Sequence, residues 1–107
     1  MAIDLPLPVR ALVDAANTGD IGAFLQCFTP EGIVDDWGRE FQGPQAIRRW
    51  SDKEFIGVRV SLRVTTVSGT DPDLMVTAQV GGDGFNGPSH FVFHLDGSRV
   101  ARLTIRG

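Results

Sequence analysis

The sequence contains few of the residues on which disulfide-rich, zinc-binding and nucleic-acid-binding proteins depend. Its 107 residues include one cysteine, Cys27, and no tyrosine. A single cysteine excludes an internal disulfide and a zinc site built from several cysteines, so Cys27 is interpreted as a small buried hydrophobic residue. The net charge is −3 and the basic residues form no run. Because nucleic-acid binding depends on clustered cations, we expect no nucleic-acid partner.

Long hydrophobic runs are also missing. Residues 1–12 have no basic start, and Pro6 and Pro8 interrupt their short apolar run. This pattern is typical neither of a signal peptide nor of a membrane span, so we expect a cytoplasmic protein with no membrane partner. The length and the 42 % hydrophobic content predict one domain, residues 1–107, with a core of its own.

Three segments in the first half of the chain carry apolar residues at helical spacing. The first helix is predicted over residues 8–19, because proline suits a first helical turn and glycine a helix end. Asp20 is the predicted N-cap of a second helix that reaches Phe28. A third helix is predicted to open at residues 43 and 44, which are glycine and proline. The positions that share a face are Val9, Leu12, Val13 and Ala16, then Ile21, Phe24, Leu25 and Phe28, and then Ala46, Ile47 and Trp50.

Alternating apolar residues predict strands in the rest of the chain. Between the second and third helices we expect a turn at residues 29–32, a strand over 32–36 and a short arm over 39–41. Four longer strands follow the third helix, which predicts an α+β fold with three N-terminal helices packed on one face of a curved, mostly antiparallel sheet. The buried strand positions are expected to be Val58, Val60, Leu62 and Val64; Leu74, Val76, Ala78 and Val80; Phe91, Phe93 and Leu95; and Ala101, Leu103 and Ile105.

The order of these segments resembles the nuclear transport factor 2-like superfamily, and most of all its SnoaL-like and ketosteroid-isomerase-like bacterial members. The residues that carry the resemblance are N-T-G-D between two helices, F-T-P-E-G, the strand end V-D-D, G-R-E-F-Q-G-P-Q-A-I, and H-F-V-F-H-L-D-G-S-R-V-A-R-L. The resemblance implies a cone-shaped half-barrel and a deep apolar pocket between helices and sheet. It further implies a hydrophobic small-molecule ligand, no cofactor, and a homodimer formed through the outer sheet face.

The resemblance also implies a role for Asp36, which stands where ketosteroid isomerase has its general base. The oxyanion donors of that enzyme are missing, because Leu12 stands in place of a tyrosine and Ser89 in place of an aspartate. Since one lost donor typically costs about a hundredfold or more in rate, steroid isomerase activity is not expected. The Arg-x-Asp pair of the limonene epoxide hydrolases is also missing from residues 74–80.

Only one of Asp35 and Asp36 can enter the pocket, because successive strand residues point to opposite faces. The other is then a surface residue. If Val34 and Asp36 face inward, Asp36 lies among aromatic side chains, where a carboxylate suits proton transfer. The alternative is that Asp36 only begins the turn at Trp37.

The expected site therefore contains Asp36 as base, Ser89 as oxyanion donor, and a ligand-contacting set. That set is Leu12, Val34, Trp37, Trp50, Phe55, Phe91 and Phe93. Ser89 could equally be a solvated residue at a strand start, and the aromatic members could be core residues. The glycine-rich loop over residues 81–88 is expected to hold Phe85 near the mouth of the pocket.

His90 and His94 share one strand face, but four strand residues span roughly 13 Å, so no metal site is expected. By the resemblance, that face is the dimer surface. Two functions stay open from the sequence. One is cofactor-independent proton transfer of isomerase, cyclase or dehydratase type on a hydrophobic carbonyl compound, and the other is a non-catalytic ligand-binding or dimerisation module with the same pocket.

Overall fold

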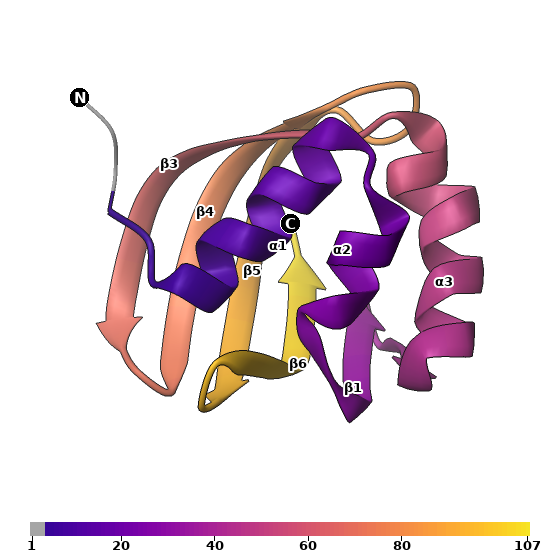
Figure 1. Cartoon of the computed structure of the whole chain (residues 1–107). Helices are drawn as coiled ribbons and strands as arrows, with labels where there is room; N and C mark the ends of the chain where they lie inside the picture. The colour runs from indigo at the N-terminus through magenta and orange to yellow at the C-terminus, as the bar shows by residue number, and fades with distance from the viewer. Residues whose placement is uncertain (1–3) are drawn as a thin grey trace.

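A computed structural model describes residues 4–107, which form three α-helices packed on one face of a six-stranded sheet (Figure 1). The domain predicted over residues 1–107 and the N-terminal segment of residues 1–12 both begin with residues 1–3, which lie outside the described range. The helices are α1 (Leu7–Thr18), α2 (Ile21–Gln26) and α3 (Gly43–Glu54), and a 3₁₀ turn, η1 (Ile56–Val58), follows α3. The strands are β1 (Phe28–Asp36), β2 (Arg39–Gln42), β3 (Ser61–Thr70), β4 (Asp73–Gly81), β5 (Gly87–Asp96) and β6 (Arg99–Arg106).

The sheet is open and curved, with the strand order β2-β1-β6-β5-β4-β3. Neighbouring strands are antiparallel except β1 and β6, which run parallel. The edge strands β2 and β3 do not pair with each other, and the helices lie against the side toward which the sheet curls (Figure 1). The predicted α+β cone with three helices on a mostly antiparallel sheet is confirmed.

Local sequence signals fix the two ends of the loop between α1 and α2. Gly19 has φ 71°, a left-handed conformation that glycine adopts without strain, and it ends α1 as predicted. Asp20 accepts a hydrogen bond from the backbone N–H of Ala23 at 3.0 Å and caps α2. These two residues therefore determine where α1 ends and α2 begins.

The predicted end of the second helix and the turn after it are wrong. The helix ends at Gln26, and Phe28 already belongs to β1. The reason is a long-range contact, because Phe28 pairs with Val100 of β6, whose N–H donates to the carbonyl of Cys27 at 2.8 Å. Residues 29–32 are extended, with a register shift between Phe28 and Ile33.

Two strand predictions also need correction. Val58 lies in η1 rather than in a strand, β3 begins at Ser61, and Val64 is only half-buried. In β6, Val100 is fully buried while Ala101 is half-buried, the reverse of the expected order. The cause is a register shift in the pairing with β5, which skips Ala101.

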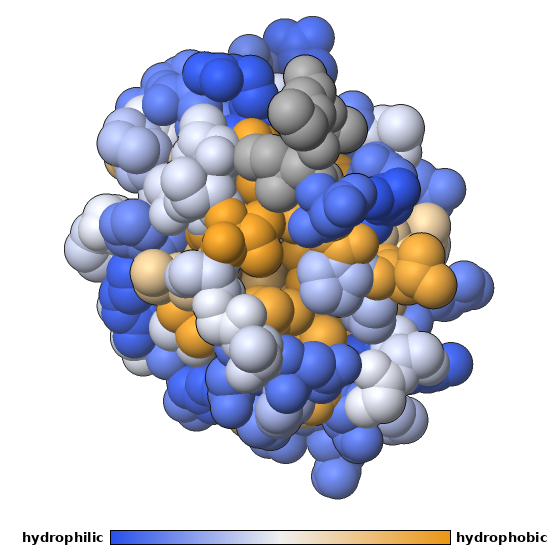
Figure 2. All heavy atoms as spheres, turned by 90° about the vertical axis from the view of Figure 1, so that its left-hand side faces the viewer, coloured by the Kyte–Doolittle hydropathy of each residue, from blue (hydrophilic) through white to orange (hydrophobic). Residues whose placement is uncertain are grey.

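The core fills the space between the helices and the concave face of the sheet. Leu12 of α1, Phe24 of α2 and Phe93 of β5 meet there with at most 1 % of their surface exposed. Burying each such side chain stabilises the fold by about 1.5–3 kcal/mol. Seen from the side of β3 and the beginning of α1, apolar side chains gather at the centre of the face within a ring of polar ones (Figure 2).

Among residues 4–107, no helix has both the length and the apolar character that crossing a membrane requires.

Candidate functional site

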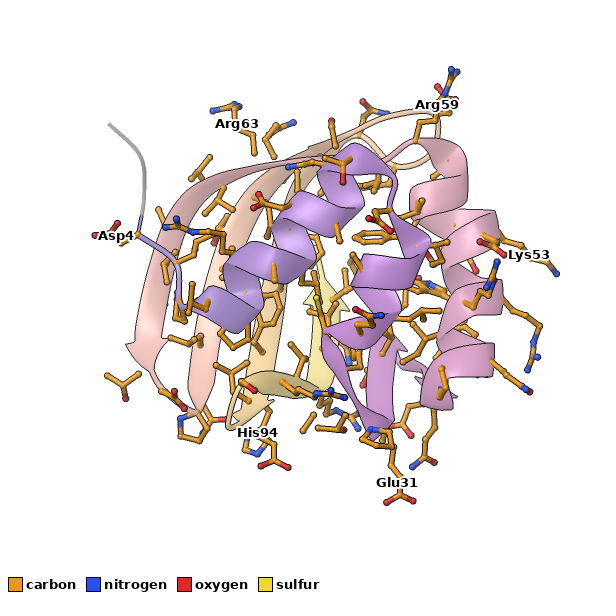
Figure 3. The ribbon with its side chains drawn as sticks, in the orientation of Figure 1. Asp4, Glu31, Lys53, Arg59, Arg63 and His94 are labelled. Carbon is orange, nitrogen blue, oxygen red and sulfur yellow. The ribbon has the colours of Figure 1, made fainter. Side chains whose placement is uncertain are left out.

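A cavity of about 430 Å³ lies between the end of α3, η1 and the concave side of the sheet. Its volume is in the range typical of small-molecule sites, roughly 300–1,000 Å³. Arg59 marks this end of the molecule, while His94 and Glu31 lie at the opposite end (Figure 3). The lining residues are Asp36, Trp37, Arg39, Trp50, Lys53, Glu54, Phe55, Val58, Val60, Val80, Gly81, Gly84, Phe85, Ser89, Phe91 and Ile105.

The deep wall of the cavity is aromatic. Trp50 of α3 stacks on Phe55 with ring centroids 4.9 Å apart, and Phe91 contributes from β5. Trp50 and Phe55 are only 3 % and 5 % exposed, so each packs in the core and also faces the cavity. The core and ligand-contact interpretations of these two residues are therefore compatible.

Asp36 is the aspartate that lines the cavity, at the end of β1. Its side chain is 14 % exposed. Oδ2 accepts two hydrogen bonds, from Trp50 Nε1 at 3.0 Å and from Arg39 Nη2 at 2.7 Å. Within residues 4–107, Oδ1 has no hydrogen-bond donor. One carboxylate oxygen is thus anchored and the other is available to a ligand.

Arg39 joins Asp36 to a second carboxylate. Its Nη1 and Nη2 donate to Oε2 and Oε1 of Glu54 at 3.0 and 2.7 Å, which makes an Asp36–Arg39–Glu54 triad between the β1–β2 hairpin and α3. The hydrogen bond to Arg39 lowers the pKa of Glu54, and the same bond raises the pKa of Arg39. The triad and Lys53 are the charged residues of an otherwise largely apolar lining.

The sequence analysis missed Arg39 and Glu54. A signal for Arg39 is present in the two residues between it and Asp36. Trp37 and Gly38 have φ values of 54° and 90°, the pattern of a type I′ hairpin turn, and Asp36 and Arg39 are paired across it. A two-residue hairpin turn places its flanking residues opposite each other, so recognising it would have predicted the pair.

Asp35 points to the outer face of the sheet, but it is not a solvated surface residue as expected. It is 7 % exposed, because the side chains of Arg102 and Arg106 cover it. Arg106 Nη1 and the Gly38 N–H donate to its Oδ1 at 3.0 and 2.8 Å, and Arg102 Nη2 donates to its Oδ2 at 2.9 Å. Hydrogen bonds from Arg106, Gly38 and Arg102 outweigh burial and lower the pKa of Asp35 to about 2.

Ser89 is 4 % exposed and lies on the cavity wall at the start of β5. Its hydroxyl makes no hydrogen bond within the described part of the chain. Among those residues, every fully buried side-chain oxygen or nitrogen has a hydrogen-bond partner, so the Ser89 hydroxyl is not fully buried. It is therefore open to the cavity. Trp37 and Phe85 form the mouth and are 62 % and 57 % exposed.

Three residues expected to contact a ligand do not line the cavity. Leu12, Val34 and Phe93 are at most 1 % exposed and lie in the core. Phe24 is fully buried beside Trp50 and Phe55, so the core already occupies the space toward α1. The residues expected from the sequence that do line the cavity are Asp36, Trp37, Trp50, Phe55, Ser89 and Phe91.

The two histidines lie away from the cavity. His90 Nδ1 is 3.0 Å from the Thr77 hydroxyl, and His94 Nδ1 is 2.6 Å from an Asp73 carboxylate oxygen. Among residues 4–107, no three His, Cys, Asp or Glu side chains are grouped closely enough to hold a metal ion.

The sequence of residues 9–103 matches the model of the SnoaL-like domain. The chain belongs to the SnoaL-like family. Among proteins with curated functions, none matches this SnoaL-like chain.

Solved structures agree with the family. A candidate polyketide cyclase from Sinorhizobium meliloti is 29 % identical, with a TM-score of 0.84 and 96 % of each chain covered. A protein from Catenulispora acidiphila with a ketosteroid isomerase-like fold, solved with trimethylamine, is 19 % identical, with a TM-score of 0.82 over 97 % of this chain and 87 % of that one. A computationally designed 17-OHP binder is 12 % identical, with a TM-score of 0.80 and coverages of 98 % and 92 %. The last two likenesses concern the fold alone.

Proposed function

We propose that this SnoaL-like protein binds a hydrophobic carbonyl compound in the cavity and that Asp36 moves a proton at the carbon next to the carbonyl. The observation that carries the proposal is that Asp36 Oδ1 lies at the wall of a largely apolar cavity and has no hydrogen-bond donor among residues 4–107. A positioned carboxylate within reach of a substrate proton is a general base. No cofactor takes part in this reaction.

The aromatic wall and the charged end of the cavity would bind different parts of the ligand. Trp50, Phe55 and Phe91 would hold the apolar body of the ligand, and the carbonyl would point toward the charged end of the cavity. Ser89 would donate a hydrogen bond to the carbonyl oxygen from its open hydroxyl. The orientation brings the acidic carbon toward Asp36 rather than toward bulk water.

The name of one structural neighbour supports this class of ligand. The protein from Sinorhizobium meliloti, which is 29 % identical to this chain, is a candidate polyketide cyclase. Fold alone does not fix chemistry, so the proposal rests on the residues of this cavity.

A non-catalytic ligand-binding module is the second candidate. It is favoured by the two donors on Asp36 Oδ2, because Trp50 and Arg39 can hold that carboxylate as part of a fixed polar rim. In that case a ligand would bind without losing a proton.

We also propose that the outer sheet face forms a homodimer. Met75 of β4 and Val92 of β5 are paired opposite each other and are 42 % and 38 % exposed, which gives this face an apolar centre. Sedimentation as a monomer at micromolar concentration would refute the dimer.

The proton-transfer proposal predicts that the protein catalyses exchange of α-protons of enolisable ketones for deuterium. NMR in D₂O with a panel of cyclic ketones measures the exchange. Asp36→Asn should slow it by at least about a hundredfold, because general-base catalysis contributes roughly 10²–10⁴ in rate. Asp52→Asn is the matched control, since Asp52 is exposed on α3 and does not line the cavity.

Binding should survive in Asp36→Asn, measured as quenching of tryptophan fluorescence by the same ketones. Equal exchange by wild type and Asp36→Asn would contradict the role of Asp36. Saturable quenching without any exchange by the wild type would favour the non-catalytic module.

A further inference from the structure

We infer that Arg39 binds the negatively charged oxygen of the ligand in this cavity. The inference rests on the proposed function and names the group that accepts the charge created by Asp36. Proton removal next to a carbonyl creates an enolate, in which most of the negative charge lies on the oxygen. Among the residues that line the cavity, Ser89 is a neutral donor, Arg39 and Lys53 are cations, and the protein has no tyrosine. A cation is the stronger partner for such a charge.

Arg39 lies in the correct place, since it lines the cavity beside the base. A guanidinium carries five N–H donors. Three are used, two on Glu54 and one on Asp36, so two have no acceptor within residues 4–107. The side chain is 53 % exposed, so a ligand can reach it.

The guanidinium is also held in a defined orientation. Glu54 of α3 binds it through two parallel hydrogen bonds, and the Phe41 ring lies 5.7 Å from its central carbon. A donor fixed before the reaction stabilises developing charge without the cost of reorganisation. Glu54 is therefore the residue that positions Arg39.

During the proton transfer, the negative charge moves from Asp36 to the ligand oxygen and stays beside Arg39. Asp36 takes the α-proton, the electrons of the broken C–H bond form a C=C bond, and the carbonyl π electrons move to the oxygen. Asp36 is then neutral and the ligand is an enolate. Because a neutral carboxyl attracts a guanidinium less than a carboxylate does, the guanidinium, still held by Glu54, can donate one of its unused N–H groups to the enolate oxygen. Asp36 returns the proton to a ligand carbon in the reverse step.

The inference predicts that the cavity binds an ionised phenol, whose oxygen carries charge as an enolate oxygen does. The probe is 4-nitrophenol, followed by the absorbance of its phenolate form. Arg39→Gln should weaken phenolate binding by about tenfold to a hundredfold, because hydrogen bonds to charged groups contribute about 1.5–3 kcal/mol. Asp36→Asn should strengthen it, since the competing carboxylate is removed.

Arg49→Gln is the matched control, because Arg49 is exposed on the same helix as Glu54 and does not line the cavity. Arg39→Lys keeps the charge without the paired donors and should bind phenolate between wild type and Arg39→Gln. Thermal unfolding of each variant shows that it is folded. Equal phenolate binding by wild type and Arg39→Gln would overturn the inference.

The rate of α-proton exchange is an independent test, because the two possible roles of Arg39 predict opposite changes in that rate. If Arg39 stabilises the enolate, Arg39→Gln should slow α-proton exchange by about a hundredfold. If Arg39 only pairs with Asp36, its removal frees the base, and exchange should stay equal or become faster. Absence of exchange in the wild type would refute the proposed function, while the phenolate titration would still decide the role of Arg39.

Discussion

Two neighbouring residues of one type have different environments in this protein. Asp36 faces the cavity with one oxygen that has no donor in the described part of the chain, whereas Asp35 faces outward and has both oxygens hydrogen-bonded. The alternation of a strand creates this difference, because it sends adjacent side chains to opposite faces. Asp35 binds Gly38, Arg102 and Arg106, and so ties the β1–β2 turn to β6. We interpret it as a residue that keeps the end of β1 in place.

The lowered pKa of Asp35 predicts a specific loss of stability in acid. A carboxylate with a pKa of about 2 in the folded state and about 4 when unfolded stabilises the fold above pH 4. That contribution should disappear as the pH falls from about 4 to 2. Asp35→Asn should reduce the free energy of unfolding at pH 7 by roughly 2 kcal/mol and flatten this acid dependence.

Urea unfolding at a series of pH values checks both effects. The control is Asp52→Asn, which removes an exposed aspartate. An unchanged acid dependence in Asp35→Asn would show that the network around Asp35 does not stabilise the fold.

Among the elements, the Trp37–Gly38 turn has the clearest connection to function. Trp37 has φ 54°, which costs a bulky residue of the order of 1 kcal/mol or more in conformational strain. Asparagine would fit this position of a type I′ turn better. Because this strained tryptophan lies at the mouth of the cavity, we propose that its ring contacts the ligand.

We therefore predict opposite effects of Trp37→Asn on stability and binding. The free energy of unfolding should stay the same or rise by up to about 1 kcal/mol, because strain is released. Ketone affinity should fall by about twofold to tenfold, the usual value of one aromatic contact. Trp37→Phe keeps an aromatic ring and should retain most of the affinity. Titration by calorimetry separates the variants, and unchanged affinity in Trp37→Asn would exclude a ligand contact.

The elements that the sequence predicted well depend on local signals. Gly19 and Asp20 end one helix and begin the next through their own backbone and side chain. Errors arose where a distant residue decides the structure. Phe28 leaves the helical pattern because it pairs with Val100, seventy-two positions later. Val58 alternates correctly with Val60 but belongs to η1, and it lines the cavity from there.

The site was predictable to the same extent. The position of Asp36 on the cavity wall agrees with the alternation of β1. Val34 and Phe93 share strand faces with Asp36 and Phe91 but lie too deep, and α1, which carries Leu12, contributes no lining residue. Periodicity reports which face a residue occupies and not how far along the cone it lies. Glu54 joins Arg39 only through the packing of α3 against the β1–β2 hairpin, which no local pattern encodes.

At the scale of the whole molecule, the cavity lies near the end of α3, between that helix, η1 and the concave face of the sheet. The deep core and the cavity share one aromatic cluster, in which Trp50 contacts Phe24 and Phe55 on one side and Asp36 on the other. Ligand binding should therefore change the environment of Trp50 more than that of any other core residue.

The most direct test is to follow the two tryptophan indole N–H signals in a nitrogen–proton NMR spectrum while a cyclic ketone is added. Trp50 is assigned by its change in Asp36→Asn, which removes the charged acceptor of its hydrogen bond. We predict a saturable shift of the Trp50 signal at the ketone concentrations that quench tryptophan fluorescence. A ketone that binds while the Trp50 signal stays unchanged would show that the ligand site lies elsewhere and would contradict the account.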